Sequence, residues 1–217
     1  MKNSFYILFL TILIFASAKA ENLNIESRTI SLDKENKLAV FKDEVVAQDD
    51  KRNILKAEYA EYSKELQVLT SKGDTSIVTS EGFKVTGKNM VFDNSKKIIK
   101  SDEPAIIEDL DKNKNFLDKF EYSTQNHFFK STGKIKILDK NDNSYNFSQL
   151  YIDEKKREIL GTDIKAYLNQ ESFKIREKNK PRVFANTVKI DDKESEFTKS
   201  IFTLCNYRKN DKCPPWS

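Results

Sequence analysis

The stretch ILKAEYAEYSKELQVLTSKGDTSIVTSEGF, residues 54–83, is one copy of a unit that repeats every 30 residues along this chain. Tyr62 serves as the anchor of this copy. Apolar residues stand two before, seven after and fifteen after it, and the next residue has a short side chain suited to a turn. These positions keep the same residue types at the same spacing through five copies, without an insertion. The anchors are Leu32, Tyr62, Phe92, Tyr122 and Ile152, preceded by Ile30, Ala60, Met90, Phe120 and Leu150, and followed by Asp33, Ser63, Asp93, Ser123 and Asp153, by Ala39, Leu69, Ile99, Phe129 and Ile159, and by Ala47, Ile77, Ile107, Ile137 and Tyr167.

A sixth copy follows with its register shifted by eight residues. In this copy Val188, Ile190, Asp191 and Phe197 take the first four positions, and Cys205 takes the fifteenth. A fixed period of this length is typical of stacked repeats, in which each unit contacts mainly its neighbours. We therefore expect one repetitive domain over residues 21–204.

Within each copy, apolar and polar residues alternate, which is the pattern of a half-buried β-strand. Ala57 and Tyr59 follow one parity, and Ala60 and Tyr62 continue on the other. A parity switch at a fixed place predicts a bulge or bend in the strand. A further break falls at Pro104, which cannot donate in a central hydrogen-bond ladder. We expect two long, bent antiparallel strands per copy, about twelve in all, with little helix.

The composition fits sheets with one buried and one wet face, because 33% of the residues are charged and 38% are hydrophobic. Two interpretations of the inward apolar columns remain open. If the facing sheets close tightly, the columns are simply core. If the sheets splay into a V, the same columns line a groove that holds alkyl chains.

Residues 1–20 have the features of a secretory signal peptide. Lys2 supplies the positive start, residues 5–15 are apolar, and Ala18-Lys19-Ala20 gives a small-x-small cleavage pattern. An uncleaved N-terminal anchor is the alternative. Export would place the domain in an oxidising compartment, where cysteine pairs persist.

The segment 169–181, between the fifth and sixth copies, is rich in Lys, Glu and Asn. A longer surface loop is the simple interpretation. A partner-docking loop is the alternative, and nothing in the sequence favours it.

Several function classes find no support. Lysines and acids are interspersed without a basic block, so we expect no nucleic-acid binding. His127 is the only histidine; it falls in a turn, where we expect a solvated side chain and neither a metal site nor a catalytic dyad. Carboxylates fall in turns or alternate with Lys, and no pair is singled out for hydrolysis. We expect no enzyme, no catalytic residue, no metal and no cofactor.

The repeats resemble the OstA-like family of lipopolysaccharide-transport proteins. The resemblance rests on AEYAEY at 57–62, KGD at 72–74 and KSDEPAII at 100–107, together with the leader. It implies a β-jelly-roll of stacked, bent antiparallel hairpins that binds and transfers lipopolysaccharide in the periplasm. Its implied partners are lipopolysaccharide and another OstA-like jelly-roll, joined edge to edge. The lipid-binding residues would be Met90, Phe92, Ile99, Ile107, Phe120, Tyr122, Phe129, Ile137, Leu150 and Ile152.

The end of the chain sharpens the resemblance. FTLCNYRKNDKCPPW, residues 202–216, is similar to the segment between the jelly-roll and the outer-membrane barrel in the LptD branch of the family. That implies a Cys-containing exit segment over 205–217, with disulfides from Cys205 and Cys213 to a barrel, and outer-membrane assembly partners. From the residues alone, a local Cys205–Cys213 bond is equally open. We expect a fragment of an LptD-like protein, with a stand-alone LptA-like carrier or a structural β-solenoid without lipid as alternatives.

The first unit, residues 23–32, is expected to be the docking edge. It carries no Pro, and its only charges are Glu26 and Arg28, so its unpaired backbone is poorly protected. We therefore expect another jelly-roll to add a strand there.

Overall fold

The computed structural model describes residues 23–173, 181–191 and 193–204. Within these ranges the chain forms one antiparallel sheet of 16 strands and one short 3-10 helix, so the predicted all-β fold class is confirmed. No helix in the same ranges is long and apolar enough to cross a membrane. The elements are β1 (Asn24–Glu26), β2 (Thr29–Asp33), β3 (Leu38–Gln48), β4 (Ile54–Ser63), β5 (Val68–Val78), β6 (Lys84–Lys88), β7 (Val91–Asp93), β8 (Ile98–Ser101), β9 (Ala105–Glu108), β10 (Lys114–Leu117), β11 (Phe120–Ser123), β12 (Phe128–Leu138), β13 (Ser144–Asp153), β14 (Glu158–Tyr167), η1 (Gln170–Phe173), β15 (Arg182–Ile190) and β16 (Ser195–Thr203).

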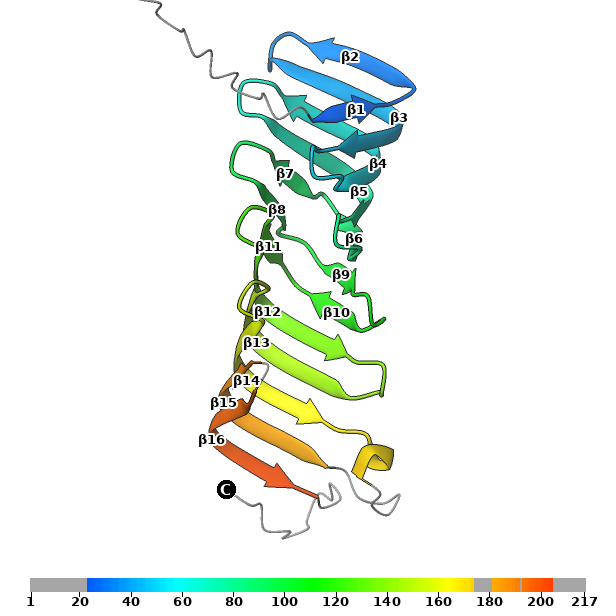
Figure 1. Ribbon diagram of the computed structural model, residues 1–217. Helices are drawn as coiled ribbons and strands as arrows, with labels where there is room; N and C mark the ends of the chain where they lie inside the picture. Colours follow the sequence, from blue (N-terminus) through cyan, green and yellow to red (C-terminus); the bar gives the residue numbers. More distant parts are fainter. Residues whose placement is uncertain (1–22, 174–180, 192, 205–217) are drawn as a thin grey trace, which may run out of the picture.

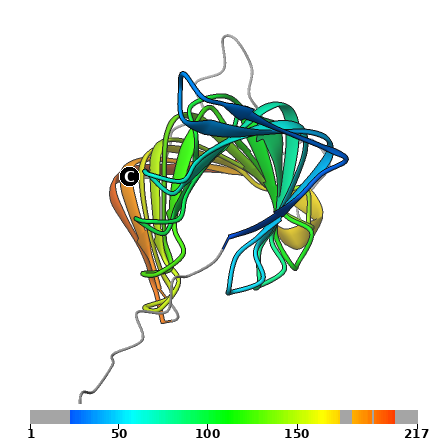
Figure 2. The same ribbon diagram turned by 90° about the horizontal axis from the view of Figure 1, so that it is seen from above.

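The strands stack almost in chain order as a tall, twisted column with β1 and β2 at one end and β16 at the other (Figure 1). Seen along the column, the sheet bends into an arch that is open on one side (Figure 2). The bend divides it into two half-sheets that face each other. The first half-sheet ends in loops 34–37, 64–67, 94–97, 124–127, 154–157 and 191–194, and the second in loops 49–53, 79–83, 109–113 and 139–143.

The bend lies where the parity switch and Pro104 predicted a corner. Four of the expected long strands are each broken in two at this corner, which is why about twelve expected strands appear as 16. The unbroken strands β3, β5 and β12 instead carry a bulge at the corner. In two of these bulges a glycine, Gly73 or Gly133, adopts a positive φ, of 78° and 103° respectively, which glycine tolerates without strain.

The anchor column and the column seven residues after it form one inward row across the whole sheet. The repeat therefore sets the strand register directly, because the second to fifth anchors pair with apolar partners on both neighbouring strands and the first, Leu32, pairs with Ala39 on β3. The turn column is confirmed too, since each of its five side chains accepts the backbone N–H three residues later. The inward row is Leu32, Ala39, Tyr62, Leu69, Phe92, Ile99, Tyr122, Phe129, Ile152, Ile159 and Ile190.

The column fifteen after the anchor is confirmed in four copies and wrong in the fifth. From Ala47 to Ile137 it forms a second inward row, but Ala166 rather than Tyr167 continues that row. The reason is that β14 pairs with β13 without the extra corner residue that β12 carries. Tyr167 consequently faces outward and is 45% exposed.

The sixth copy also departs from the predicted register. Val188 and Ile190 occupy the expected rows, but the residue paired with Ile190 comes five positions later instead of the seven seen at Ile152. Phe197 therefore lies opposite Val188, and Phe202 takes the place predicted for Cys205.

A column of small residues lets the two half-sheets pack at the corner. Ser71, Ser101 and Ser131 are at most 1% exposed, and Gly161 continues their 30-residue spacing. Each serine hydroxyl donates to a corner carbonyl, as Ser131 Oγ does to the oxygen of Lys119 at 2.7 Å. The serines thus add hydrogen bonds to backbone groups at the place where the strand ladder is interrupted.

The loops of the second half-sheet are tied to one another by asparagine side chains. Asn143 lies against Asp139, with its backbone N–H at 2.9 Å and its Nδ2 at 2.7 Å from the two carboxylate oxygens. Its Oδ1 accepts the N–H of Asn169 in the next layer at 2.7 Å. Asn53 and Asn113 repeat both contacts, so three equivalent links run along this edge.

Candidate functional site

The residues predicted to bind lipid all lie on the inner side of the arch, where the two half-sheets turn apolar side chains toward each other. They belong to one continuous cluster that extends from the first unit to the sixth. Seven are at most 9% exposed, namely Met90, Phe92, Ile99, Phe120, Tyr122, Phe129 and Leu150, and three are partly buried, namely Ile107, Ile137 and Ile152.

The interior is filled by side chains rather than open. Leu69 and Phe92 of the first half-sheet meet Leu55 and Ile77 of the second around a small void. All four are at most 4% exposed. Of the two interpretations that the repeat pattern left open, the structure therefore shows the closed core.

The ends of the column differ from its middle. In the first unit, Ile30 is 59% exposed and Leu32 is 74% exposed, although both lie in inward rows. In the last strand Phe197, also in an inward row, is 37% exposed. Because equivalent positions in the central units are buried, the apolar interior reaches the surface at the ends.

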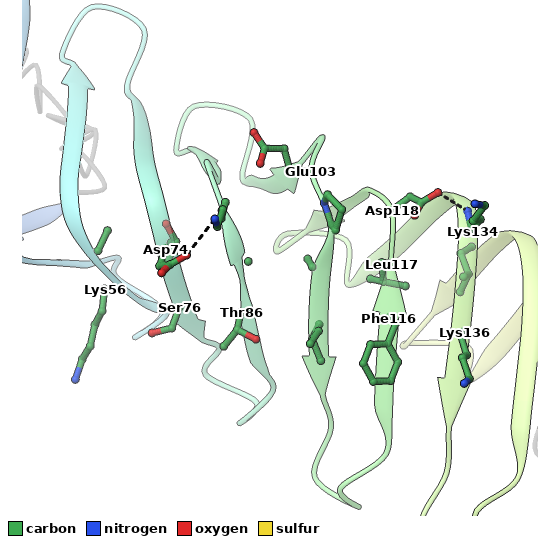
Figure 3. Close-up of a pocket in the computed structure, with 18 of the residues that line it drawn as sticks. Lys56, Asp74, Ser76, Thr86, Glu103, Phe116, Leu117, Asp118, Lys134 and Lys136 are labelled. Atoms are coloured by element: carbon green, nitrogen blue, oxygen red, sulfur yellow. Dashed lines mark hydrogen bonds and ion pairs between the residues drawn. The ribbon is translucent and has the colours of Figure 1, made fainter.

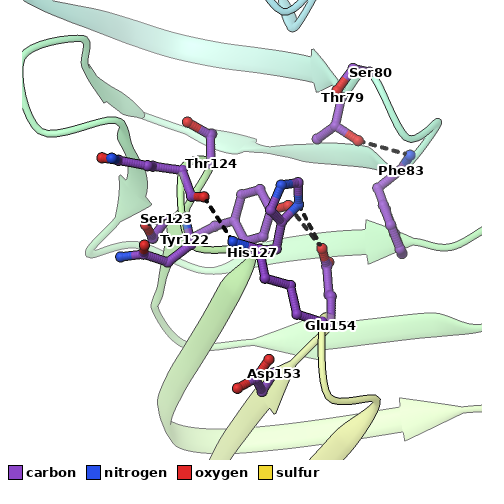
Figure 4. A network of polar contacts seen from close by, with 12 residues as sticks. Thr79, Ser80, Phe83, Tyr122, Ser123, Thr124, His127, Asp153 and Glu154 are labelled. Carbon is purple, nitrogen blue, oxygen red and sulfur yellow. Dashed lines mark hydrogen bonds and ion pairs between the residues drawn. The ribbon is translucent and has the colours of Figure 1, made fainter.

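A polar cluster borders the interior at the loop edge of the first half-sheet (Figure 4). Tyr122 donates its hydroxyl to Glu154 Oε2 at 3.0 Å, and His127 Nδ1 lies 3.5 Å from the same oxygen. Burial raises the pKa of the Tyr122 phenol well above its usual value, and the carboxylates of Glu154 and Glu81 raise it further. His127 is thus not the fully solvated side chain that the sequence predicted, since its side chain is only 32% exposed.

A second tyrosine repeats this arrangement on the other half-sheet. Tyr145 lies in an inward row and donates its hydroxyl to Asp139 Oδ2 at 3.2 Å. Burial, followed by the charge of Asp139, raises the pKa of Tyr145 to about 12. At both edges the inward surface therefore ends in a phenol that contacts a loop carboxylate.

The outer side of the second half-sheet is hollowed near the corner (Figure 3). The hollow has a volume of about 1530 Å³. Its lining mixes charges of both signs with apolar residues, among them Ile106, Phe116 and Leu117. Figure 3 shows Lys56, Ser76, Thr86, Phe116 and Lys136 in one row, and Glu103, Asp118 and Lys134 nearer the corner.

Two further points concern metal ligands and the ends of the chain. In the described residues, no group of three or more His, Cys, Asp or Glu side chains is arranged to hold a metal ion. Cys205, Cys213 and the predicted leader, residues 1–20, lie outside the described residues.

Sequence reasoning missed the serine column and the asparagine links. Both carry the same 30-residue period as the apolar columns: Ser71, Ser101 and Ser131 in one case, Asn113 and Asn143 in the other. A search for periodic polar residues, and not only apolar ones, would have found them.

Comparisons with known proteins leave the function to be argued from this chain's own residues. No protein-family model matches the chain, and no curated protein matches it. Among solved structures, the chain is similar to LptH, described as the LptA homologous periplasmic component of the conserved lipopolysaccharide transport device from Pseudomonas aeruginosa. The identity is 13%, the match covers 61% of this chain and 76% of that chain, and the TM-score is 0.26.

Proposed function

We propose that this chain is a periplasmic, non-enzymatic lipopolysaccharide carrier that holds acyl chains among its inward apolar rows. The observation that carries the proposal is the continuity of these rows, which run from the first unit to the sixth without an inward-facing charge. A purely structural stack has no need for an apolar interior that reaches the surface at its ends. The resemblance of residues 57–62, 72–74 and 100–107 to OstA-like proteins supports the same function.

Binding by this interior requires the two half-sheets to move apart, because the rows pack against each other. The driving force is the transfer of acyl chains out of water, about 0.8 kcal/mol per buried CH₂ group. Contacts between facing side chains are exchanged for contacts with the lipid, so apolar packing is retained on both sides. The many outward Lys and Glu side chains keep the outer surface wet.

Two adjacent phenylalanines allow a sharp test. Phe129 is buried in the interior, and Phe128 is 39% exposed on the outer face. A photoreactive phenylalanine analogue would replace one or the other, and the folded protein would be irradiated with purified lipopolysaccharide. We expect a cross-link at position 129 and little at position 128. Equal labelling at both positions, or none at 129, would contradict the proposal.

A structural β-solenoid without lipid is the second candidate, and the closed core favours it. Met90, Leu69 and Ala60 are 0% exposed, so the central interior is as well packed as an ordinary protein core. Absence of any lipopolysaccharide cross-link in a folded protein would support this candidate.

We further propose that the first unit docks another OstA-like jelly-roll edge to edge. β1 and β2 pair only with β3, so each offers a free edge in the described chain. The exposed Ile30 and Leu32 would extend their inward rows onto the partner. The second jelly-roll would thereby cover apolar surface that the first unit leaves in water.

The assignment to the N-terminal part of an LptD-like protein rests on residues 202–216. An LptA-like carrier shares the repeats but lacks the cysteine segment that Cys205 and Cys213 define. Non-reducing gels of single Cys→Ser variants in the intact gene product separate the two. A bond from either cysteine to a distant cysteine supports the LptD-like assignment, and a bond only between Cys205 and Cys213 opposes it.

A further inference from the structure

The open side of the arch is bordered by two sets of loops. The first lip consists of the first half-sheet's loops, including 94–97 and 124–127. The second lip consists of the second half-sheet's loops, including 49–53 and 79–83. An amphiphile that keeps its tails inside and its polar head outside has to pass its linking atoms between these lips.

The two lips touch each other in the middle of the column. Lys51 Nζ on the second lip donates a hydrogen bond to the backbone oxygen of Thr124 on the first lip at 3.0 Å. These residues are 73 positions apart in sequence. The contact therefore joins the two half-sheets across the open side of the arch.

Both partners of this contact are held in place by their own lips. Thr124 donates its backbone N–H to the oxygen of Lys97 at 2.8 Å, and its hydroxyl donates to the same oxygen. Lys51 donates its backbone N–H to Asp49 Oδ1 at 3.0 Å, in a loop that Asn53 links to Ser80. Because the loops are fixed, the lysine reaches a carbonyl whose position is already set.

A second approach between the two lips involves loop 79–83 and a polar cluster on the first lip. Loop 79–83 approaches the cluster of Tyr122, His127 and Glu154 (Figure 4). Burial is the main cause of the raised pKa of Tyr122, and the charge of Glu81 on the second lip adds to it. Beneath this place the inward residues are buried, whereas Ile30 and Leu32 at the end are exposed.

We propose that the contact between Lys51 and Thr124 is the latch of a gate that opens for the lipid head and closes behind it. This inference rests on the proposed function and adds its regulation. The exposed apolar residues at the ends admit acyl chains, and the latch interrupts the gap between the lips along which the head has to travel. Breaking the latch lets the half-sheets part, and the interior exchanges protein contacts for lipid contacts.

The test compares opened and locked proteins. Lys51→Ala removes the donor that crosses the gap. Lys140→Ala is the matched control, because Lys140 lies on the second lip but contacts Asp111 on that same lip, with Nζ to Oδ1 at 3.1 Å. With the photoreactive group at position 129, we expect Lys51→Ala to speed lipopolysaccharide cross-linking severalfold and Lys140→Ala to leave it unchanged.

Locking the lips together should slow lipopolysaccharide cross-linking. In a background with Cys205→Ser and Cys213→Ser, Lys51→Cys and Gln125→Cys would be joined by a flexible bis-maleimide. We expect photo-cross-linking of lipopolysaccharide at position 129 to fall at least tenfold. The control joins Lys140→Cys to Asp111→Cys within one lip and should have no effect. Unchanged cross-linking in the locked protein would overturn the gate and leave the proposed function standing.

A measurement without lipid distinguishes failure of the gate from failure of the proposed function. Spin labels on Lys51→Cys and Gln125→Cys report the distance between the lips. Because the first label replaces Lys51, the contact between Lys51 and Thr124 is lost in that protein. The reference protein carries its labels on Arg52→Cys and Gln125→Cys and keeps Lys51. We expect a narrow distance distribution in the reference and a broad one once Lys51 is lost. Equal distributions overturn the gate, whereas the absence of lipopolysaccharide cross-linking in every protein overturns the proposed function.

Discussion

Phe129 stacks on Phe120 inside the arch, with ring centroids 6.2 Å apart and ring planes inclined by 17°. Its sequence neighbour Phe128 faces outward and lies near Tyr151, with ring centroids 6.3 Å apart. One residue of chain therefore separates the packed interior from the wet surface.

This pair predicts opposite responses to the same substitution. Phe129→Asp buries an unpaired carboxylate among apolar side chains, and we expect a loss of more than about 3 kcal/mol in the free energy of unfolding, or no folding. Phe128→Asp exposes its carboxylate, and we expect a change below about 1 kcal/mol. Urea unfolding followed by circular dichroism measures both. A small loss for Phe129→Asp would mean that the interior is open.

Gly161 predicts a clash that a second substitution relieves. A Cβ atom at this position would lie 2.6 Å from Cδ1 of Phe147 and 3.2 Å from Val188. We expect Gly161→Ala to cost about 1–3 kcal/mol through overpacking. In the double variant with Phe147→Leu the added cost of the alanine should shrink, because the ring is gone. A double-mutant cycle measured by urea unfolding tests this, and strictly additive costs would contradict it.

The confirmed and the wrong parts of the sequence prediction have one physical origin. Hydrophobic period sets the strand register, so the anchor row from Leu32 to Ile190 followed from spacing alone. Tyr167 was misplaced because one corner residue is lost in β14, and such a loss shifts every later side chain by one position. The Lys51–Thr124 contact could not be predicted, because it depends on how far the column twists between distant units.

The asparagine links predict position-specific stability. Asn143→Ala removes the Nδ2 hydrogen bond to Asp139 and the acceptor for the N–H of Asn169, while the hydrogen bond from the backbone N–H to Asp139 remains. Only the side-chain bonds are lost, and the buried groups left behind should cost about 1–3 kcal/mol. The control Asn141→Ala in the same loop removes an exposed amide and should change little. Equal thermal melting points for the two variants would rule out a stabilising role for the link.

Asp139 predicts an acid response. Its burial pushes its pKa up, but hydrogen bonds from Asn143 and Asn141 outweigh this and hold the pKa below the usual 3.8. A carboxyl whose pKa is lower in the folded state adds stability above pH 3.8, and that stability is lost as the pH falls through the folded pKa. We expect the wild type to lose more stability than Asp139→Asn below about pH 4. Urea unfolding at several pH values tests this, and parallel curves would refute it.

The docking edge predicts a selective loss of binding. Asn24→Pro or Glu26→Pro removes a backbone N–H from β1 and should abolish strand addition by an LptA-like jelly-roll, while the later units remain folded. Asn24→Ala keeps the N–H and serves as the control. Analytical ultracentrifugation of the mixed proteins reports the complex. Unchanged association of the proline variants would place the interface elsewhere.

The shared register of the copies makes the length of the column adjustable. Each 30-residue unit adds two strands, which lengthens the stack by about 10 Å at the usual strand spacing. Because anchor rows, serine column and turn residues recur at the same offsets, a duplicated central unit such as residues 94–123 would meet matching neighbours on both sides. The length of the stack therefore follows the number of 30-residue units. A different distance can be spanned by changing the number of copies, without a new fold.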